Sequence, residues 1–145
     1  MGQLRFPDFS VIYLDTSPII YSVEKHVDFW PILEPFWIDV ESGKIKVVTS
    51  ELTLLEVLVV PIRVNNQPLI NAYDALFSSG DIKVVPISAP VLRDAAQLRA
   101  TQNFKTPDAI HAATASLANC DYLISNDSGF RRLAGIDVTI LSDLI

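Results

Sequence analysis

The segment SVIYLDTSP, residues 10–18, passes from an apolar β-branched run to residues that commonly begin a helix. The same order recurs in four later segments: IKVVTSE (45–51), DIKVVPIS (81–88), DYLISND (121–127) and DVTILSD (137–143). Strands that are apolar on both faces and joined by long helical crossovers are typical of parallel sheets. The sequence therefore predicts an α/β fold, in which a parallel sheet of about five strands lies between two layers of helices.

The segments between the expected strands have helical character. They span residues 18–24, 27–42, 51–63, 68–79, 89–101 and 107–119, with a short one at 128–133. In two of them a hydroxyl residue precedes a proline, which predicts that Ser17 and Thr106 cap helices beginning at Pro18 and Pro107. Prolines at 31 and 35 predict that the helix over 27–42 is irregular or split.

A single domain over residues 1–145 accounts for the chain, because 50% of its residues are hydrophobic and no internal repeat divides it. The net charge of -6 speaks against binding nucleic acid through a broad basic surface, so any such contact must be local. The N-terminus lacks a secretion signal, the longest apolar runs are too short to span a membrane, and the single cysteine, Cys120, suits a reducing compartment. We therefore expect a cytoplasmic protein with no membrane partner.

Carboxylates are common in this chain, with 17 acidic residues, so position must decide which of them form a site. Ligands bind to open parallel sheets at the carboxyl ends of the strands, where the strand order reverses. Asp15 and Asp127 follow expected strands and belong to that edge. Asp81, Asp121 and Asp137 precede strands and belong to the opposite edge, where turn or solvation roles are expected.

Two further acids lie in unusually apolar helices. Asp108 opens the alanine-rich helix over 107–119, and Glu56 lies within LTLLEVLVVPI (52–62). Each has an ordinary explanation, because Asp108 complements the positive end of a helix dipole and Glu56 could lie on an exposed stripe. A buried carboxylate, however, needs a partner, and a metal ion would serve.

Four acids, Asp15, Glu56, Asp108 and Asp127, thus converge on one edge of the predicted sheet. Carboxylates this close raise one another's pKa unless a cation neutralises them. The divalent cations that prefer oxygen ligands, Mg²⁺ or Mn²⁺, suit such a site. The chemistry inferred is metal-assisted hydrolysis of a phosphodiester or phosphomonoester.

This pattern resembles the PIN domain family of metal-dependent ribonucleases, which includes the VapC-type toxins of toxin-antitoxin pairs. The matching motifs are VIYLDTSPIIY (11–21), SELTLLEVL (50–58), TPDAIHAATA (106–115) and YLISNDSGFRRL (122–133). The resemblance covers nearly the whole chain. It departs from many relatives in the loop QNFKTP (102–107), which lacks a glycine.

The resemblance implies a three-layer α/β/α fold with strand order 3-2-1-4-5, and it makes Asp15, Glu56, Asp108 and Asp127 the metal site. It also implies a Mg²⁺- or Mn²⁺-dependent endoribonuclease that forms a homodimer and is often inhibited by a small antitoxin encoded beside it. A weaker set is expected to contact RNA or to support the acids; it comprises Thr16, Lys105, Ser125, Asn126 and Arg131.

His111, one helical turn beyond Asp108, could be a metal ligand or a general base, but the chain has no histidine cluster and a structural role is favoured. Two other functions stay open. A haloacid-dehalogenase-like phosphatase also has an Asp after its first strand, but it needs a second Asp where this chain has Ser17. A non-catalytic PIN-like module could keep the fold, and bind RNA or protein, without turnover.

Overall fold

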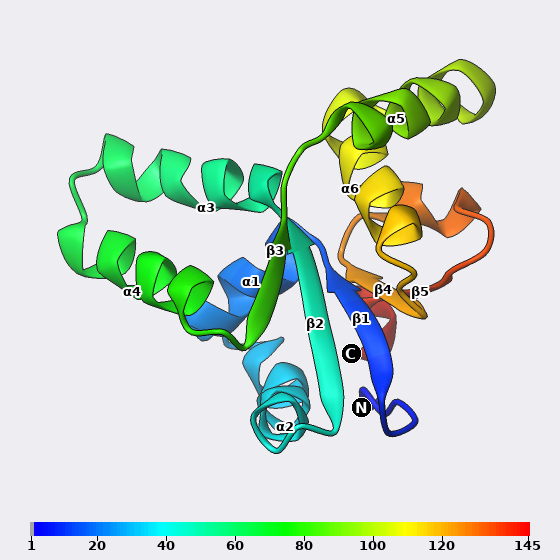
Figure 1. Ribbon diagram of the computed structural model, residues 1–145. Helices are drawn as coiled ribbons and strands as arrows, with labels where there is room; N and C mark the ends of the chain where they lie inside the picture. The colour runs from blue at the N-terminus through cyan, green and yellow to red at the C-terminus, as the bar shows by residue number, and fades with distance from the viewer. Residues whose placement is uncertain (1) are drawn as a thin grey trace.

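A computed structural model describes residues 2–145 of the chain as a three-layer α/β/α arrangement (Figure 1). Its centre is a five-stranded sheet in the order β3-β2-β1-β4-β5, in which every neighbouring pair is parallel. The strands are β1 (Ser10–Leu14), β2 (Ile45–Ser50), β3 (Ile82–Val85), β4 (Tyr122–Ser125) and β5 (Asp137–Ile140). The predicted strands and the strand order implied by the resemblance are confirmed.

The helices occupy the segments between the strands, as predicted. They are α1 (Thr16–Val23), α2 (Trp30–Glu41), α3 (Glu51–Arg63), α4 (Gln67–Ser78), α5 (Ala89–Gln102) and α6 (Thr106–Leu117), with the 3₁₀ helices η1 (Ser128–Arg132) and η2 (Leu141–Leu144). Figure 1 shows α3 and α4 side by side as a hairpin of helices next to β3, at one edge of the sheet. Within residues 2–145, no helix has both the length and the apolarity needed to cross a bilayer.

Alternation of side chains along the strands divides the core into two layers. Ile12 and Leu14 point to one face of the sheet, where they pack with residues of α1, α2, α3 and α4. Tyr13, between them, points to the other face and packs with α5 and α6. The period of two in an extended strand requires this division, and a strand buried on both faces is apolar at successive positions.

The predicted helix starts require correction. The side chain that caps α1 is that of Asp15, not Ser17, because the Asp15 carboxylate accepts a hydrogen bond from the backbone N–H of Thr16 and the helix begins there. Helix α6 begins at Thr106, and its N-cap residue, Lys105, makes no capping hydrogen bond through its side chain. Pro18 is therefore the third residue of α1, and Pro107 is the second residue of α6. In the first turn of a helix the missing N–H of proline costs no helical hydrogen bond.

Helix α2 also differs from the prediction, because it begins at Trp30 rather than at residue 27 and runs unbroken through Pro35. Pro31 lies in the first turn, where proline is tolerated, so only Pro35 removes an internal hydrogen bond. The helix buries Leu33 and Phe36 completely against the sheet. Burial of such side chains stabilises by about 1.5–3 kcal/mol each, which is enough to offset the loss of one hydrogen bond.

The pairing of β1 with β4 positions the functional edge of the sheet. These strands meet where the chain reverses its direction of travel across the sheet, with Leu14 beside Ile124. The backbone N–H of Asp15 extends the ladder by donating to the carbonyl of Ile124 at 3.1 Å. Asp15 therefore lies next to Ser125, at the carboxyl ends of both strands, where parallel sheets bind ligands.

Candidate metal centre

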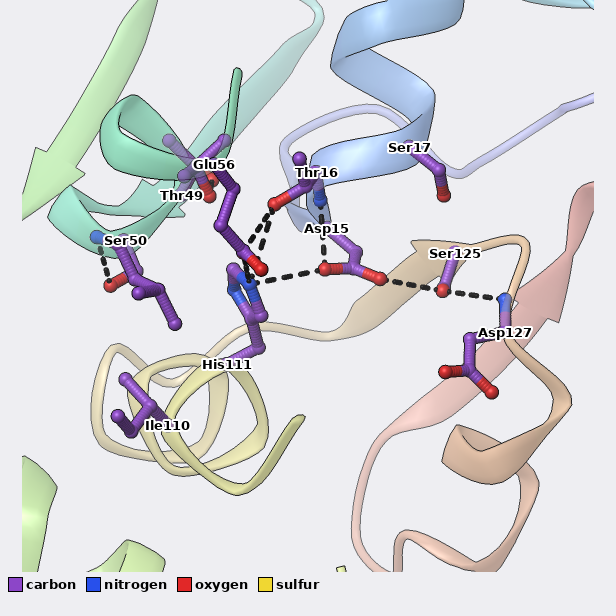
Figure 2. Close-up of polar contacts among 12 residues, drawn as sticks. Asp15, Thr16, Ser17, Thr49, Ser50, Glu56, Ile110, His111, Ser125 and Asp127 are labelled. Atoms are coloured by element: carbon purple, nitrogen blue, oxygen red, sulfur yellow. Dashed lines mark hydrogen bonds and ion pairs between the residues drawn. The ribbon is translucent and has the colours of Figure 1, made fainter. Parts of the chain in front are cut away.

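Asp15 lies at the middle of the polar cluster in Figure 2, and both of its carboxylate oxygens have donors. The Thr16 backbone N–H donates to Oδ1 at 2.7 Å, and the Ser125 hydroxyl donates to Oδ2 at 2.8 Å. The side chain of Asp15 is 10% exposed, so these bonds replace most of the water that a carboxylate would otherwise bind. They fix the orientation of the carboxylate.

Ser125 links Asp15 to Asp127. Its hydroxyl donates to Asp15 and accepts a hydrogen bond from the backbone N–H of Asp127 at 2.9 Å (Figure 2). Asp127 is exposed, and its Oδ1 caps η1 by accepting from the Gly129 N–H at 2.8 Å. The Ser125 hydroxyl therefore connects Asp15, at the end of β1, with Asp127, which follows β4.

Glu56 reaches the cluster from α3. Its Oε1 accepts from the Thr16 hydroxyl at 2.7 Å, and it lies 2.7 Å from His111 Nε2. Burial alone would raise the pKa of Glu56, but these two hydrogen bonds and the histidine charge outweigh burial and lower the pKa. The Glu56 side chain is 29% exposed, so it forms part of the outer rim of the cluster.

His111, for which the sequence favoured a structural role, lies inside the acidic cluster. Its Nε2 is 2.7 Å from Glu56 Oε1 and 3.2 Å from Asp15 Oδ1, and its side chain is 1% exposed. Burial alone would lower the pKa of His111, but the hydrogen bond to Glu56 and the charges of Asp15, Glu56 and Asp108 raise it. The available signal was its spacing, since His111 follows Asp108 by three residues and shares its helix face.

Asp108 projects from the first turn of α6 toward the other acids. Burial, followed by the negative charges of Asp127 and Asp15, raises the pKa of Asp108 to about 6. Asp127 and Asp15 therefore act on Asp108 directly, and Glu56 joins Asp15 through His111. The assignment of all four acids to one metal site stays a prediction.

The weaker set of predicted residues divides into two groups. Thr16 and Ser125 hold the acids by the hydrogen bonds described above, whereas Asn126 connects the Tyr21 hydroxyl at 3.2 Å to the Ser142 N–H at 2.9 Å. Lys105 is exposed beside the start of α6. Arg131 forms an exposed ion pair with Asp143, whose two carboxylate oxygens accept from the same nitrogen, Nη2, at 2.8 and 2.7 Å.

The donor set fits a divalent cation. Asp15, Glu56 and His111 each offer one ligand atom, and these atoms lie within 4.8 Å of one another. Burial, and then the charges of Asp127 and Asp15, raise the pKa of Asp108, and a cation bound beside these carboxylates would favour their ionised forms. Carboxylate oxygens suit Mg²⁺ and Mn²⁺.

A parallel sheet in this order, with carboxylates gathered at its switch point, defines a class of small α/β proteins with an acidic metal centre. The model of the PIN domain family matches residues 12–136. The chain belongs to the PIN domain family. A search of curated proteins gives no match.

Solved structures with the same fold come from VapBC toxin-antitoxin systems. VapBC2 of Rickettsia felis, bound to a promoter DNA fragment, aligns with a TM-score of 0.70 and 18% identity over 90% of this chain and 98% of that one. VapC20 of Mycobacterium tuberculosis, a sarcin-ricin loop cleaving toxin, aligns with a TM-score of 0.70 and 20% identity over 86% and 95%. VapBC-1 of nontypeable Haemophilus influenzae gives 0.67 and 18% over 91% and 98%.

Asp108→Asn should stabilise the metal-free protein at neutral pH. Asp108 ionises near 3.8 in the unfolded chain but near 6 in the folded one, so above pH 6 its charge destabilises the folded state, and below about pH 4 both states are protonated. After removal of metal with a chelator, the midpoint temperature of unfolding at pH 7.5 should be about 2–4 °C higher in the variant than in the wild type. This corresponds to a gain of ~1 kcal/mol in the free energy of unfolding, because solvent screens the charges. The gain should vanish near pH 4.

The control for that measurement is Asp81→Asn, which removes an exposed acid at the opposite edge of the sheet. A pH-independent gain in both variants, or a loss of stability in Asp108→Asn at pH 7.5, contradicts the proposed repulsion.

Proposed function

We propose that this protein is a Mg²⁺- or Mn²⁺-dependent endoribonuclease, and that it is the toxin of a toxin-antitoxin pair. The proposal is supported by the polar group of Asp15, Glu56 and His111 at the carboxyl edge of β1 and β4, and by Asp108, whose pKa burial and the charges of Asp127 and Asp15 raise. These four acids are the proposed catalytic and metal-binding residues.

The chain's own residues prepare this site for a cation. Hydroxyl and backbone donors from Thr16 and Ser125 hold Asp15 and Glu56 in place, so little reorganisation is needed when a ligand enters. A bound divalent cation would supply Lewis-acid polarisation of the phosphodiester and activation of a water. The four acids would hold that cation at the switch point of the sheet.

The exposure of the site suits a polymeric substrate. Asp127 is exposed and the Glu56 side chain is partly exposed, whereas Asp15 lies deeper. A phosphate of an RNA strand can therefore approach from the surface, while the net charge of -6 confines favourable contacts to local groups such as Lys105. Unpaired RNA, whose backbone and bases are accessible, fits such an opening. We also propose that the protein acts in the cytoplasm.

Relatives of the same fold support the toxin assignment. One is a toxin that cleaves the sarcin-ricin loop, and two others are structures of VapBC systems. A small antitoxin is accordingly the proposed protein partner. A short reading frame beside this one, whose product binds this chain, would support that partner, and the absence of such a frame would remove the toxin role while leaving the ribonuclease role to be tested directly.

Two alternatives make different predictions. A haloacid-dehalogenase-like phosphatase would require a carboxylate two residues after Asp15, where Ser17 instead accepts a hydrogen bond from the Asn126 N–H at 3.2 Å. A non-catalytic PIN-like module would bind RNA or protein without cleaving RNA. Cleavage of RNA by the purified protein separates both alternatives from the proposal.

Asp15→Asn and Asp108→Asn should each abolish Mn²⁺-dependent cleavage of RNA, a loss of at least ~100-fold, because each removes a charged ligand rather than a supporting contact. Cleavage should be followed on total RNA by gel electrophoresis and mapped by sequencing. Asp81→Asn is the matched control and should cleave like the wild type. Full cleavage by both site variants would exclude the four-acid site.

Homodimerisation is the second proposed association, and exposed apolar side chains on α3 support it. Leu55, Val59 and Ile62 follow one another at spacings of four and three residues, so they lie on one face of the helix, and they are 61%, 42% and 56% exposed. Apolar side chains concentrated on one element of the surface are typical of an interaction site rather than of a solvated helix. We propose that a second copy of the chain covers this face of α3.

Ile62→Glu should convert the dimer to a monomer, because it places a charge in the covered face. Sedimentation velocity at micromolar concentration measures the change. Val27→Glu, at a position that is 83% exposed in the loop before α2, should leave the dimer intact. A monomeric wild type, or an Ile62→Glu variant that remains dimeric, removes α3 as the interface.

A further inference from the structure

His111 is the one side chain among residues 2–145 that contacts both Glu56 and Asp15 while also belonging to the helix of Asp108. It thereby connects α6, α3 and the end of β1 through a single buried ring (Figure 2). The ring contacts two of the acids, Glu56 and Asp15, and the helix that carries it also carries Asp108 three residues earlier.

The far side of the ring is held by Tyr13. The Tyr13 hydroxyl lies 2.6 Å from His111 Nδ1, and both side chains are fully buried. A tyrosine hydroxyl carries its hydrogen at neutral pH, so that of Tyr13 can donate a hydrogen bond to Nδ1 at this distance. A neutral imidazole that accepts at Nδ1 carries its hydrogen at Nε2.

The contacts of Nε2, on the opposite side of the His111 ring, also require a hydrogen on that nitrogen. Nε2 faces Glu56 Oε1 at 2.7 Å and Asp15 Oδ1 at 3.2 Å, and a bare nitrogen lone pair would be repelled by two carboxylate oxygens. Nε2 therefore bears hydrogen whether the ring is neutral or protonated. A nitrogen that bears hydrogen is a donor to carboxylates and not a ligand to a cation.

We propose that His111 is a positioning residue of the metal centre: its Nε2–H holds the Glu56 and Asp15 carboxylates in the orientation that receives a divalent cation. The bonds to Glu56 from both His111 and Thr16 end on Oε1, so Oε2 remains for the cation. This inference rests on the proposed metal-dependent function. It assigns the ligands to carboxylate oxygens and gives His111 a supporting role.

The test is the affinity for Mn²⁺, measured by titration calorimetry on the whole chain without RNA. His111→Leu, which fills similar space without a donor, should weaken Mn²⁺ binding by about 10–100-fold. His111→Gln places an amide N–H close to the position of Nε2, so its affinity should lie nearer to the wild type than to the leucine variant. His26→Leu, which alters the other histidine of the chain, should bind like the wild type.

Each outcome decides a separate point. If the wild type does not bind Mn²⁺, the proposed function fails. If the wild type binds and the leucine variant binds equally well, or if glutamine binds no better than leucine, the positioning role alone is overturned. Electron spin-echo spectroscopy of the Mn²⁺-loaded wild type needs no variant: the proposal expects no directly coordinated imidazole nitrogen, and its detection would make His111 a ligand instead.

Discussion

The parallel pairing of β1 with β4 is the contact around which the site is arranged. It continues one residue past the strands, where the Asp15 N–H donates to the Ile124 carbonyl, and so places Asp15 against Ser125. Without that register the Ser125 hydroxyl could not connect Asp15 to the backbone of Asp127. The crossovers of the fold then bring α3 and α6 to the same edge, each with one further acid.

Carboxylates concentrated at one edge repel one another in the absence of a cation. Hydrogen-bond donors around them reduce this repulsion but do not remove it. Backbone and hydroxyl donors satisfy Asp15, and His111 with Thr16 satisfies Glu56. Asp108 receives less compensation, since its carboxyl group faces the charges of Asp127 and Asp15. Unrelieved repulsion of this kind is characteristic of functional sites, where binding a cation recovers the lost stability.

Local chemistry explains which features could be predicted from the sequence. Apolar β-branched runs located all five strands, and the acids that end strands or open apolar helices located the candidate site. The predicted start of α1 was wrong because Asp15 and Ser17, two residues apart, can each cap a helix. The Asp15 carboxylate does so, and the helix begins at Thr16. The contacts of His111 with Tyr13 and Glu56 join residues 98 and 55 positions apart, and no local pattern encodes them.

The central claim is that the four acids hold a divalent cation at the switch point of the sheet. Crystals of the protein grown with Mn²⁺ test it directly, because anomalous scattering locates manganese independently of the protein model. The account predicts one principal anomalous peak among the carboxylates of Asp15, Glu56, Asp108 and Asp127, and its loss in Asp15→Asn crystals. Strong manganese peaks elsewhere on the chain, with none at this edge, would contradict it.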